Sequence, residues 1–111
     1  MVVYNKDIPF DRLSETSRRK ILAHEGTQMM VEVTFDKGGE GAPHRHVHEQ
    51  ITYVAQGRFV FTIEGEKYTV AKGDSLYFPS NALHGCVCLE DGILVDIFTP
   101  QRDDFLKKQE D

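Results

Sequence analysis

Short runs of β-branched and aromatic residues alternate with turn residues along most of this chain. Such runs are typical of β-strands. They predict strands over residues 30–35, 51–55, 58–63, 66–70, 75–78, 84–89 and 93–98. Glu64-Gly65 and Glu90-Asp91-Gly92 have the composition of hairpin turns. Because the strands recur every eight to twelve residues with no helical pattern between them, we expect an all-β sandwich or barrel.

The two ends of the chain have a weaker pattern. Residues 1–28 are mixed in character, with candidate short strands at 2–4 and 19–23 that either complete the sheet or reach a partner subunit. Thr99 suits a helix cap and Pro100 suits a first helical position, which predicts a short helix in the C-terminal tail. We therefore expect one domain, with N-terminal strands and a loop over 1–28 as a candidate dimer contact, and a barrel with its tail over 29–111.

Length and composition limit the classes of function. With 111 residues the chain can bury one core, and 40% hydrophobic and 28% charged residues are ordinary for a globular protein. The formal net charge of -5 provides no general basic field, so we expect no nucleic-acid partner. No apolar run reaches the length of a membrane span, and the first residues lack the pattern of a secretory leader. These features predict a cytoplasmic protein with no membrane partner.

Cys86 and Cys88 are the two cysteines of the chain and lie one residue apart in a predicted strand. At that spacing their Cα atoms are near the upper limit for a disulfide, so we expect reduced thiols that fill space in the sheet. A metal site built on Cys-x-Cys would need a second cysteine pair, which the chain lacks.

Three of the five histidines lie within five residues, after a glycine-rich turn and before a predicted strand. Side chains alternate faces along an extended chain, so His44, His46 and Gln50 share one face. His84 follows a proline-containing turn, opens another predicted strand and is the candidate fourth ligand. Imidazole nitrogens and an amide oxygen suit one divalent transition metal, Ni, Zn, Mn, Fe or Co, without choosing among them. The alternative is that these histidines are solvated loop residues.

The glycines, histidines and proline of this region resemble the two motifs of the cupins, which are small jelly-roll barrels. The first motif is carried by Gly38, His44, His46, Gln50 and Gly57. The second motif is carried by Gly73, Pro79 and His84. Asn81 stands where glycine is usual, and asparagine also tolerates the left-handed backbone conformation. The resemblance covers roughly residues 29–98 and implies a cupin jelly-roll β-barrel with a metal in its mouth.

A finer resemblance is to pectin-degradation proteins of the KdgF type. It is carried by residues 46–50, 57–59 and 95–106. The implied activity is opening the ring of 4,5-unsaturated monouronates, which are small anionic sugar acids, to linear keto forms. The resemblance also implies a role for three residues: Asp96 as the catalytic carboxylate, Phe98 as an aromatic pocket wall and Arg102 as a binder of the substrate carboxylate. As a small cupin, the protein is further expected to form a homodimer.

The sequence leaves an alternative open for each of these three residues. Leu94, Asp96 and Phe98 share one face of their predicted strand, and if the opposite face covers the core, Asp96 points to solvent. Arg102 could be a surface residue of the C-terminal helix, and Phe98 could be an ordinary core residue.

All four candidate ligands are neutral, so a bound divalent ion would keep its full charge. Such an ion favours an anionic ligand, and it favours Lewis-acid chemistry over oxidation. A metal-dependent ring-opening enzyme is therefore the leading hypothesis. The alternatives are a non-catalytic sugar-acid binding protein and an iron-dependent dioxygenase, which oxygen consumption would reveal.

Overall fold

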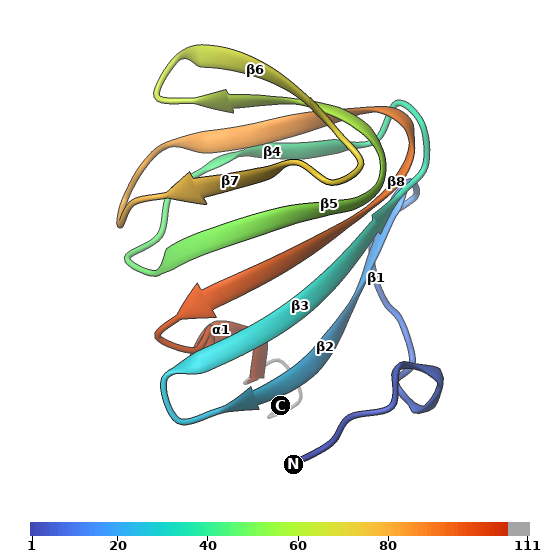
Figure 1. The fold of residues 1–111 in the computed structure, drawn as a ribbon, viewed down its shortest axis with the longest axis vertical. Coiled ribbons are helices and arrows are strands. Elements are labelled where there is room, and N and C mark those ends of the chain that lie inside the picture. The colour runs from blue at the N-terminus through green and yellow to red at the C-terminus, as the bar shows by residue number, and fades with distance from the viewer. Residues whose placement is uncertain (107–111) are drawn as a thin grey trace.

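The computed structural model describes residues 1–106 and consists mainly of antiparallel β-strands (Figure 1). The elements follow in chain order: η1 Asn5–Asp7, β1 Asp11–Ser14, β2 Ser17–Glu25, β3 Gln28–Phe35, β4 Glu40–His44, β5 Glu49–Ile63, β6 Glu66–Ala71, β7 Ser75–Phe78, β8 His84–Thr99 and α1 Asp103–Leu106. The expected all-β architecture is confirmed. The strand expected over 2–4 is wrong, because residues 2–4 adopt no strand and lead directly into η1.

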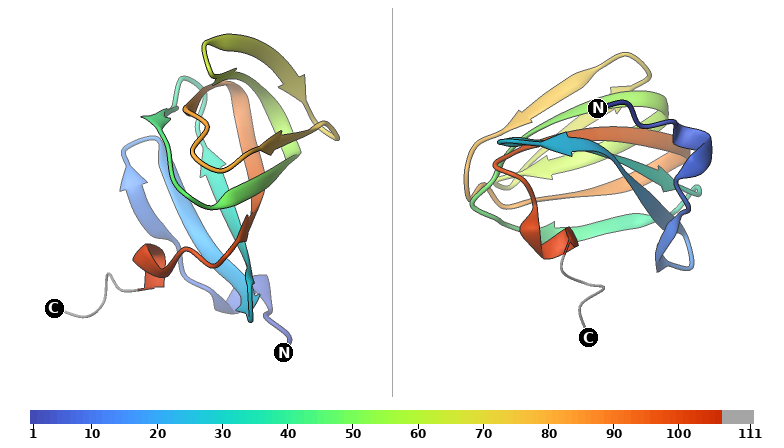
Figure 2. Two further views of the ribbon diagram at one scale, coloured as in Figure 1. Left: turned by 90° about the vertical axis from the view of Figure 1, so that its left-hand side faces the viewer. Right: turned by 90° about the horizontal axis from the view of Figure 1, so that it is seen from below.

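The two longest strands, β5 and β8, fold the sheet into two layers. They pair with each other along their length, from Glu49 opposite Thr99 to Ile63 opposite His84. The first half of β5 and the second half of β8 lie in the larger layer, with β7, β3, β2 and β1. The remaining halves lie in the smaller layer, with β6 and β4. Figures 1 and 2 show the two layers curving around one interior, which is the expected jelly-roll barrel.

Glycines permit the close approach of β5 and β8 where their pairing register shifts. Gly57 has a φ of +85°, and a Cβ atom there would lie 2.5 Å from the carbonyl oxygen of Asp91. A Cβ atom at Gly92 would lie 2.6 Å from the Phe59 ring. The hairpin expected at 90–92 is therefore wrong, because the chain continues through this segment as part of β8 and Gly92 serves close packing instead of a turn.

Two other predictions from local sequence are confirmed by the backbone. Glu64 and Gly65 both have positive φ, 48° and 85°, and they join β5 to β6 as a two-residue hairpin. Asn81 has a φ of 64°, so asparagine adopts the left-handed conformation at the motif position where glycine is usual.

Side-chain alternation along the strands builds the interior from rows of cross-strand neighbours. The first row contains Met29, Phe98, Gln50 and Phe78. The second contains Val31, Asp96, Thr52 and Leu76. The third contains Arg19, Val33, Leu94 and Val54. Most members are buried apolar residues, so the polar members stand out as interior groups that need partners.

The C-terminal segment contains the expected short helix. This helix, α1, begins at Asp103 and not near Pro100, because Thr99 is still the last residue of β8. The part of the expected tail over 107–111 lies outside the described residues. Within residues 1–106, no helix combines the length and the apolar character needed to cross a bilayer.

Candidate active site

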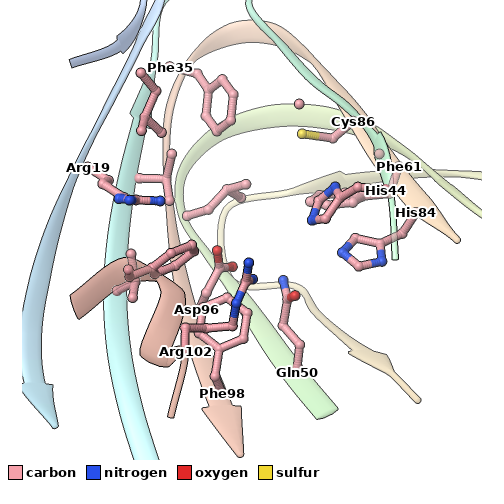
Figure 3. Close-up of a pocket in the computed structure, with 17 residues that line it drawn as sticks. Arg19, Phe35, His44, Gln50, Phe61, His84, Cys86, Asp96, Phe98 and Arg102 are labelled. Carbon is pink, nitrogen blue, oxygen red and sulfur yellow. The ribbon is translucent and has the colours of Figure 1, made fainter. Parts of the chain in front are cut away.

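A cavity of about 250 Å³ lies in the interior between the two layers (Figure 3). It is lined by six of the seven site residues predicted from the sequence: His44, Gln50, His84, Asp96, Phe98 and Arg102. The seventh, His46, lies beside the other two histidines. The volume is below the roughly 300–1,000 Å³ of pockets for drug-sized ligands, so the cavity suits a small molecule.

Three histidines gather on one side of the cavity. His44 ends β4 and is the register partner of His84, the first residue of β8. His46 lies in the connection between β4 and β5, two residues after the end of β4. Its ring nevertheless lies 5.4 Å from that of His44 and 5.1 Å from that of His84. One nitrogen of each ring lies within 4.8 Å of the other two, which is compatible with a shared metal ion.

Backbone carbonyl groups fix the orientation of all three rings. The Nδ1 atoms of His44, His46 and His84 lie 3.0, 3.0 and 2.8 Å from carbonyl oxygens two residues away. A carbonyl oxygen can only accept, so each Nδ1 carries the proton and each Nε2 presents a lone pair. Metal-binding histidines typically have this kind of support on the nitrogen that does not bind the ion.

Gln50, Thr52 and Asp96 form a hydrogen-bond chain whose direction follows from its chemistry. The Gln50 Nε2 atom donates to the Thr52 hydroxyl at 2.8 Å, and this hydroxyl donates to Asp96 Oδ1 at 2.7 Å. Because the single hydroxyl proton goes to the carboxylate, the Gln50 amide oxygen is the atom that faces His46 Nε2, at 3.1 Å. Two lone pairs therefore face each other, and a cation bound by both atoms would remove their repulsion.

The four side chains fit a divalent cation. Burial lowers the pKa of His46 to about 4, with the positive charge of Arg102 as the next cause, and burial also lowers the pKa of His84. These imidazoles are therefore neutral near pH 7, which is the form that binds metal. With Gln50 the cluster offers three nitrogen donors and one oxygen donor, and a bound ion would keep its double positive charge.

Asp96 faces the interior, which decides between the two orientations that the sequence left open. Leu94 and Phe98, on the same face of β8, are only 4% and 3% exposed. Burial raises the pKa of Asp96 to about 6, and its hydrogen bond from Thr52 partly opposes this shift. A carboxyl group with a pKa this close to neutrality can both accept and release a proton at physiological pH.

Phe98 and Arg102 form a further wall of the cavity. Phe98 is buried, and its ring lies 5.7 Å from that of His46. Arg102 is 9% exposed and precedes α1, so it is a cavity residue and not a surface residue of the helix. Its guanidinium carbon lies 5.0 Å from the Phe98 ring centroid and 4.1 Å from that of Phe105. Its Nε and Nη2 atoms donate to the carboxylate of Asp104 at 3.0 and 2.8 Å.

Known proteins share both the sequence and the fold of this chain. The cupin domain family matches residues 31–98. Over 102 residues the chain is 45% identical to the pectin degradation protein KdgF of Dickeya dadantii (strain 3937), which covers 90% of this chain and 93% of that protein. The chain is a cupin of the KdgF family. Among solved structures, KdgF from Halomonas sp. has a TM-score of 0.91 and 40% identity, covering 95% of this chain and 97% of the other. An RmlC-like cupin from Shewanella frigidimarina has a TM-score of 0.90 and 35% identity, covering 94% of each chain.

This cupin has one charged cavity residue that its motifs do not predict, Arg19. Figure 3 shows Arg19 projecting from the β2 side of the cavity, across from His44 and His84. A signal was present in the sequence, because Ser17, Arg19 and Ile21 share one face of a strand and the arginine is the charged member. The sequence alone did not show which face of that strand points inward.

Two further residues near the site have packing roles. Both cysteines are free thiols, and burial raises the pKa of Cys86 to about 12, so its thiol stays neutral in the cavity wall. The His48 ring packs against the rings of His46 and Phe98 at 5.4 and 6.4 Å. Its backbone carbonyl accepts a hydrogen bond from His46 Nδ1, so His48 helps to orient the His46 ring.

Proposed function

We propose that this cupin opens the ring of a 4,5-unsaturated monouronate to the linear keto form, with a divalent transition metal held by His44, His46, Gln50 and His84. The observation that carries the proposal is a carboxyl group, Asp96, that lines one small cavity together with neutral metal donors. The relatives support the substrate class, because two of them are named KdgF and one of these is named a pectin degradation protein.

The size and charge of the cavity support a single sugar acid as the ligand. A volume of about 250 Å³ suits one sugar ring better than an oligosaccharide. Arg19 and Arg102 place two positive charges in the lining against the one carboxyl group of Asp96, and a divalent metal would add two more. An anionic ligand is therefore favoured in the cavity, although the whole chain carries a net charge of -5.

The proposed reaction is an isomerisation that removes one proton and adds another. Loss of the C1 hydroxyl proton lets the bond between C1 and the ring oxygen break, and the ring oxygen keeps the electron pair as a C5 enolate. Protonation at C4 then gives the C5 ketone and ends the double bond between C4 and C5. We assign both proton transfers to Asp96, whose pKa of about 6 suits acceptance and release.

The other cavity residues have supporting roles in this proposal. When bound, the metal would supply Lewis-acid polarisation of a substrate oxygen. Thr52 holds the Asp96 carboxyl group in place through its hydroxyl. Phe98 keeps that part of the wall apolar, and Arg102 binds the substrate carboxylate with the Nη1 donors that Asp104 does not use.

The test is the ultraviolet absorbance of the conjugated double bond, which the reaction removes. Metal-loaded protein is expected to accelerate its loss, and the same protein after chelation is expected to match buffer. If metal-loaded protein binds a sugar acid in calorimetry without accelerating the loss, the chain is a binding protein instead. Consumption of oxygen with the sugar acid would indicate a dioxygenase.

We also propose that the chain forms a homodimer through the outer face of the larger layer. One row of cross-strand neighbours on that face contains Met30, Ile97, Ile51 and Tyr77. Ile51 and Tyr77 are 47% and 55% exposed, and Tyr53 in the adjacent row is 47% exposed. Aromatic residues and methionine with few charges are typical of the centre of a protein interface. A second copy suits this face because a two-fold interface pairs one patch with itself.

The N-terminal segment borders the same face, which supports the expected dimer contact of residues 1–28. Asn5 donates to Glu32 and accepts from Lys20, and both partners point outward from β3 and β2. Met1 and Tyr4 beside it are 78% and 62% exposed. We further place the protein in the cytoplasm, where its two free cysteines would remain reduced.

A further inference from the structure

Arg19 is a charged residue at an interior position of the larger layer. Its register partners are Val33 on β3 and Asp11 on β1, and Leu94 follows beyond Val33 in the same row. Arg18, its neighbour in the chain, points to the outer face, where its Nη1 atom lies 3.4 Å from Asp36 Oδ1. A guanidinium group among aliphatic side chains loses hydration, and contacts in the folded protein or with a ligand must offset that loss.

The contacts of Arg19 within the described residues offset this loss incompletely. The guanidinium carbon lies 3.7 Å from the centroid of the Phe105 ring, which is a close cation–π contact. The Nε atom is buried and has no hydrogen-bond partner among residues 1–106. The carboxylates of Asp11 and Asp104 favour the charged form, but burial has the larger effect and lowers the pKa of Arg19. A buried donor without an acceptor in a cavity wall is a position where a ligand acceptor would bind.

Arg102 lies against the same aromatic ring. Its guanidinium carbon is 4.1 Å from the Phe105 centroid, compared with 3.7 Å for Arg19. The two cations repel each other, and this repulsion is one of the causes that lower the pKa of Arg19. Asp104 pairs with Arg102 but is itself largely exposed. The two guanidinium groups therefore make this side of the cavity complementary to an anion.

We propose that Arg19 is a binding residue that, together with Arg102, holds the carboxylate of the sugar-acid substrate and selects sugar acids over neutral sugars. The choice of a sugar acid rests on the proposed function, whereas the anion site rests on the contacts of Arg19 and Arg102. A guanidinium group can donate from Nε and a terminal nitrogen to both oxygens of one carboxylate. His44 and His84 lie on the opposite side of the cavity from Arg19 (Figure 3). A monouronate can therefore be bound at the histidine cluster on one side and by the Arg19 guanidinium group on the other.

The test is calorimetric binding to metal-loaded protein of the saturated acids D-galacturonate and D-mannuronate and of the neutral sugars D-galactose and D-mannose. Arg19→Gln is expected to weaken the better-bound acid by about tenfold or more, the usual effect of losing a charge-assisted hydrogen bond. It should change neutral-sugar binding by less than about twofold. Arg18→Gln removes the same charge from the outer face of the same strand, and this matched control should leave binding of the acid unchanged.

Arg19→Lys keeps the charge but lacks the planar fork, so its affinity for the acid should lie between those of Arg19→Gln and the wild type. Melting temperatures check that both variants fold. If Arg19→Gln does not fold, the test uses Arg19→Lys, whose affinity for the acid should be about threefold or more below that of the wild type. Unchanged affinity for the acid in the folded variant overturns the inference, and so does a wild-type protein that binds acids no better than neutral sugars.

These outcomes are distinct from failure of the proposed reaction. If binding of the acid depends on Arg19 but the unsaturated monouronate is not converted, the reaction is wrong and the anion site stands. If the wild type does turn over the substrate, Arg19→Gln should raise KM by about tenfold and keep kcat within about threefold, because the lost contact serves binding. A fall in kcat with unchanged KM would count against a binding role.

Discussion

The two faces of the larger layer both depart from the usual pattern: polar residues lie on the inner face and large apolar residues are exposed on the outer face. The inner face holds four polar residues in rows of apolar ones: Arg19, Gln50, Thr52 and Asp96. The outer face exposes four large apolar residues: Met30, Ile51, Tyr53 and Tyr77. Polar groups inside lose hydration on folding, whereas apolar groups outside remain in contact with water in an isolated monomer. The proposed ligand on the inner face and the proposed second copy on the outer face would each account for half of this pattern.

The two faces also differ in how far contacts within the chain satisfy these residues. On the inner face, the hydrogen bonds from Gln50 to Thr52 and from Thr52 to Asp96 satisfy three groups at once. The Nε atom of Arg19 and the lone pair of His46 Nε2 are left without a suitable partner in the described part of the chain. On the outer face, each exposed apolar side chain stays in water until another surface covers it. Each face can therefore be disrupted separately.

The largest expected effect comes from breaking the inner face at its candidate metal site. His84→Ala removes one nitrogen donor, and zinc affinity should fall by more than about 100-fold, beyond the loss caused by removing an outer partner of a ligand. Competition with a chromophoric chelator measures this affinity. His24→Ala is the matched control, because His24 bonds to Gln101 and does not line the cavity. Equal zinc affinity in the two variants would contradict the site.

The next effect comes from breaking the outer face. Ile51→Glu places a carboxylate in the exposed row, where a second copy would have to bury it. The dissociation constant of the dimer should rise by about 100-fold or more, since an unpaired buried charge costs about 3 kcal/mol. Sedimentation velocity over a concentration series measures it. Thr69→Glu adds the same charge on β6 and should leave the dimer intact. A wild type that is monomeric at every concentration would contradict the interface.

A smaller effect concerns the stability cost of the inner carboxyl group in metal-free protein. The pKa of Asp96 is raised from 3.8 to about 6, so its ionisation destabilises the fold as pH rises through this range. Asp96→Asn removes that cost and should increase the free energy of unfolding by up to about 3 kcal/mol at about pH 8. The gain should vanish below about pH 3.5, where both side chains are neutral. Urea unfolding measures both values, and a gain independent of pH would contradict the shift.

The smallest effect concerns the hydroxyl group that links the candidate ligand Gln50 to the Asp96 carboxyl group. Thr52→Val keeps the shape of the side chain but leaves Gln50 Nε2 and Asp96 Oδ1 without their shared partner. We expect a stability loss of about 1–2 kcal/mol and a fall in turnover of about tenfold. Thr52→Ser restores the hydroxyl and should recover most of the turnover, whereas equal rates in the two variants would show that the link is dispensable.

Local sequence predicted those features that depend on a single residue's backbone. Asn81 and Gly65 have positive φ because their turns require it, and few residue types tolerate that conformation. The histidines were predicted to meet because two motifs of fixed spacing supply them. Alternation along an extended chain predicted that His44 and His46 share one side, and their rings lie 5.4 Å apart although β4 itself ends at His44.

Features that depend on distant contacts could not be predicted in the same way. The Glu90-Asp91-Gly92 run suits a hairpin, yet residue 92 must be glycine because the Phe59 ring of another strand leaves no room for a Cβ atom. Alternation separated Asp96 from Val95 and Ile97, but which set faces inward depends on how β3 and β5 flank β8. Arg19 escaped prediction for the same reason, because its strand was expected but its pairing with β3 was not.

The central claim is that Asp96 and the histidine cluster act on one substrate in one cavity. Its most direct test is the rate at which metal-loaded Asp96→Asn removes the ultraviolet absorbance of an unsaturated monouronate. The rate should be about 100-fold or more below that of the wild type, with equal metal content, while Asp103→Asn on exposed α1 keeps the full rate. An Asp96→Asn protein that binds metal and keeps the wild-type rate would contradict the claim.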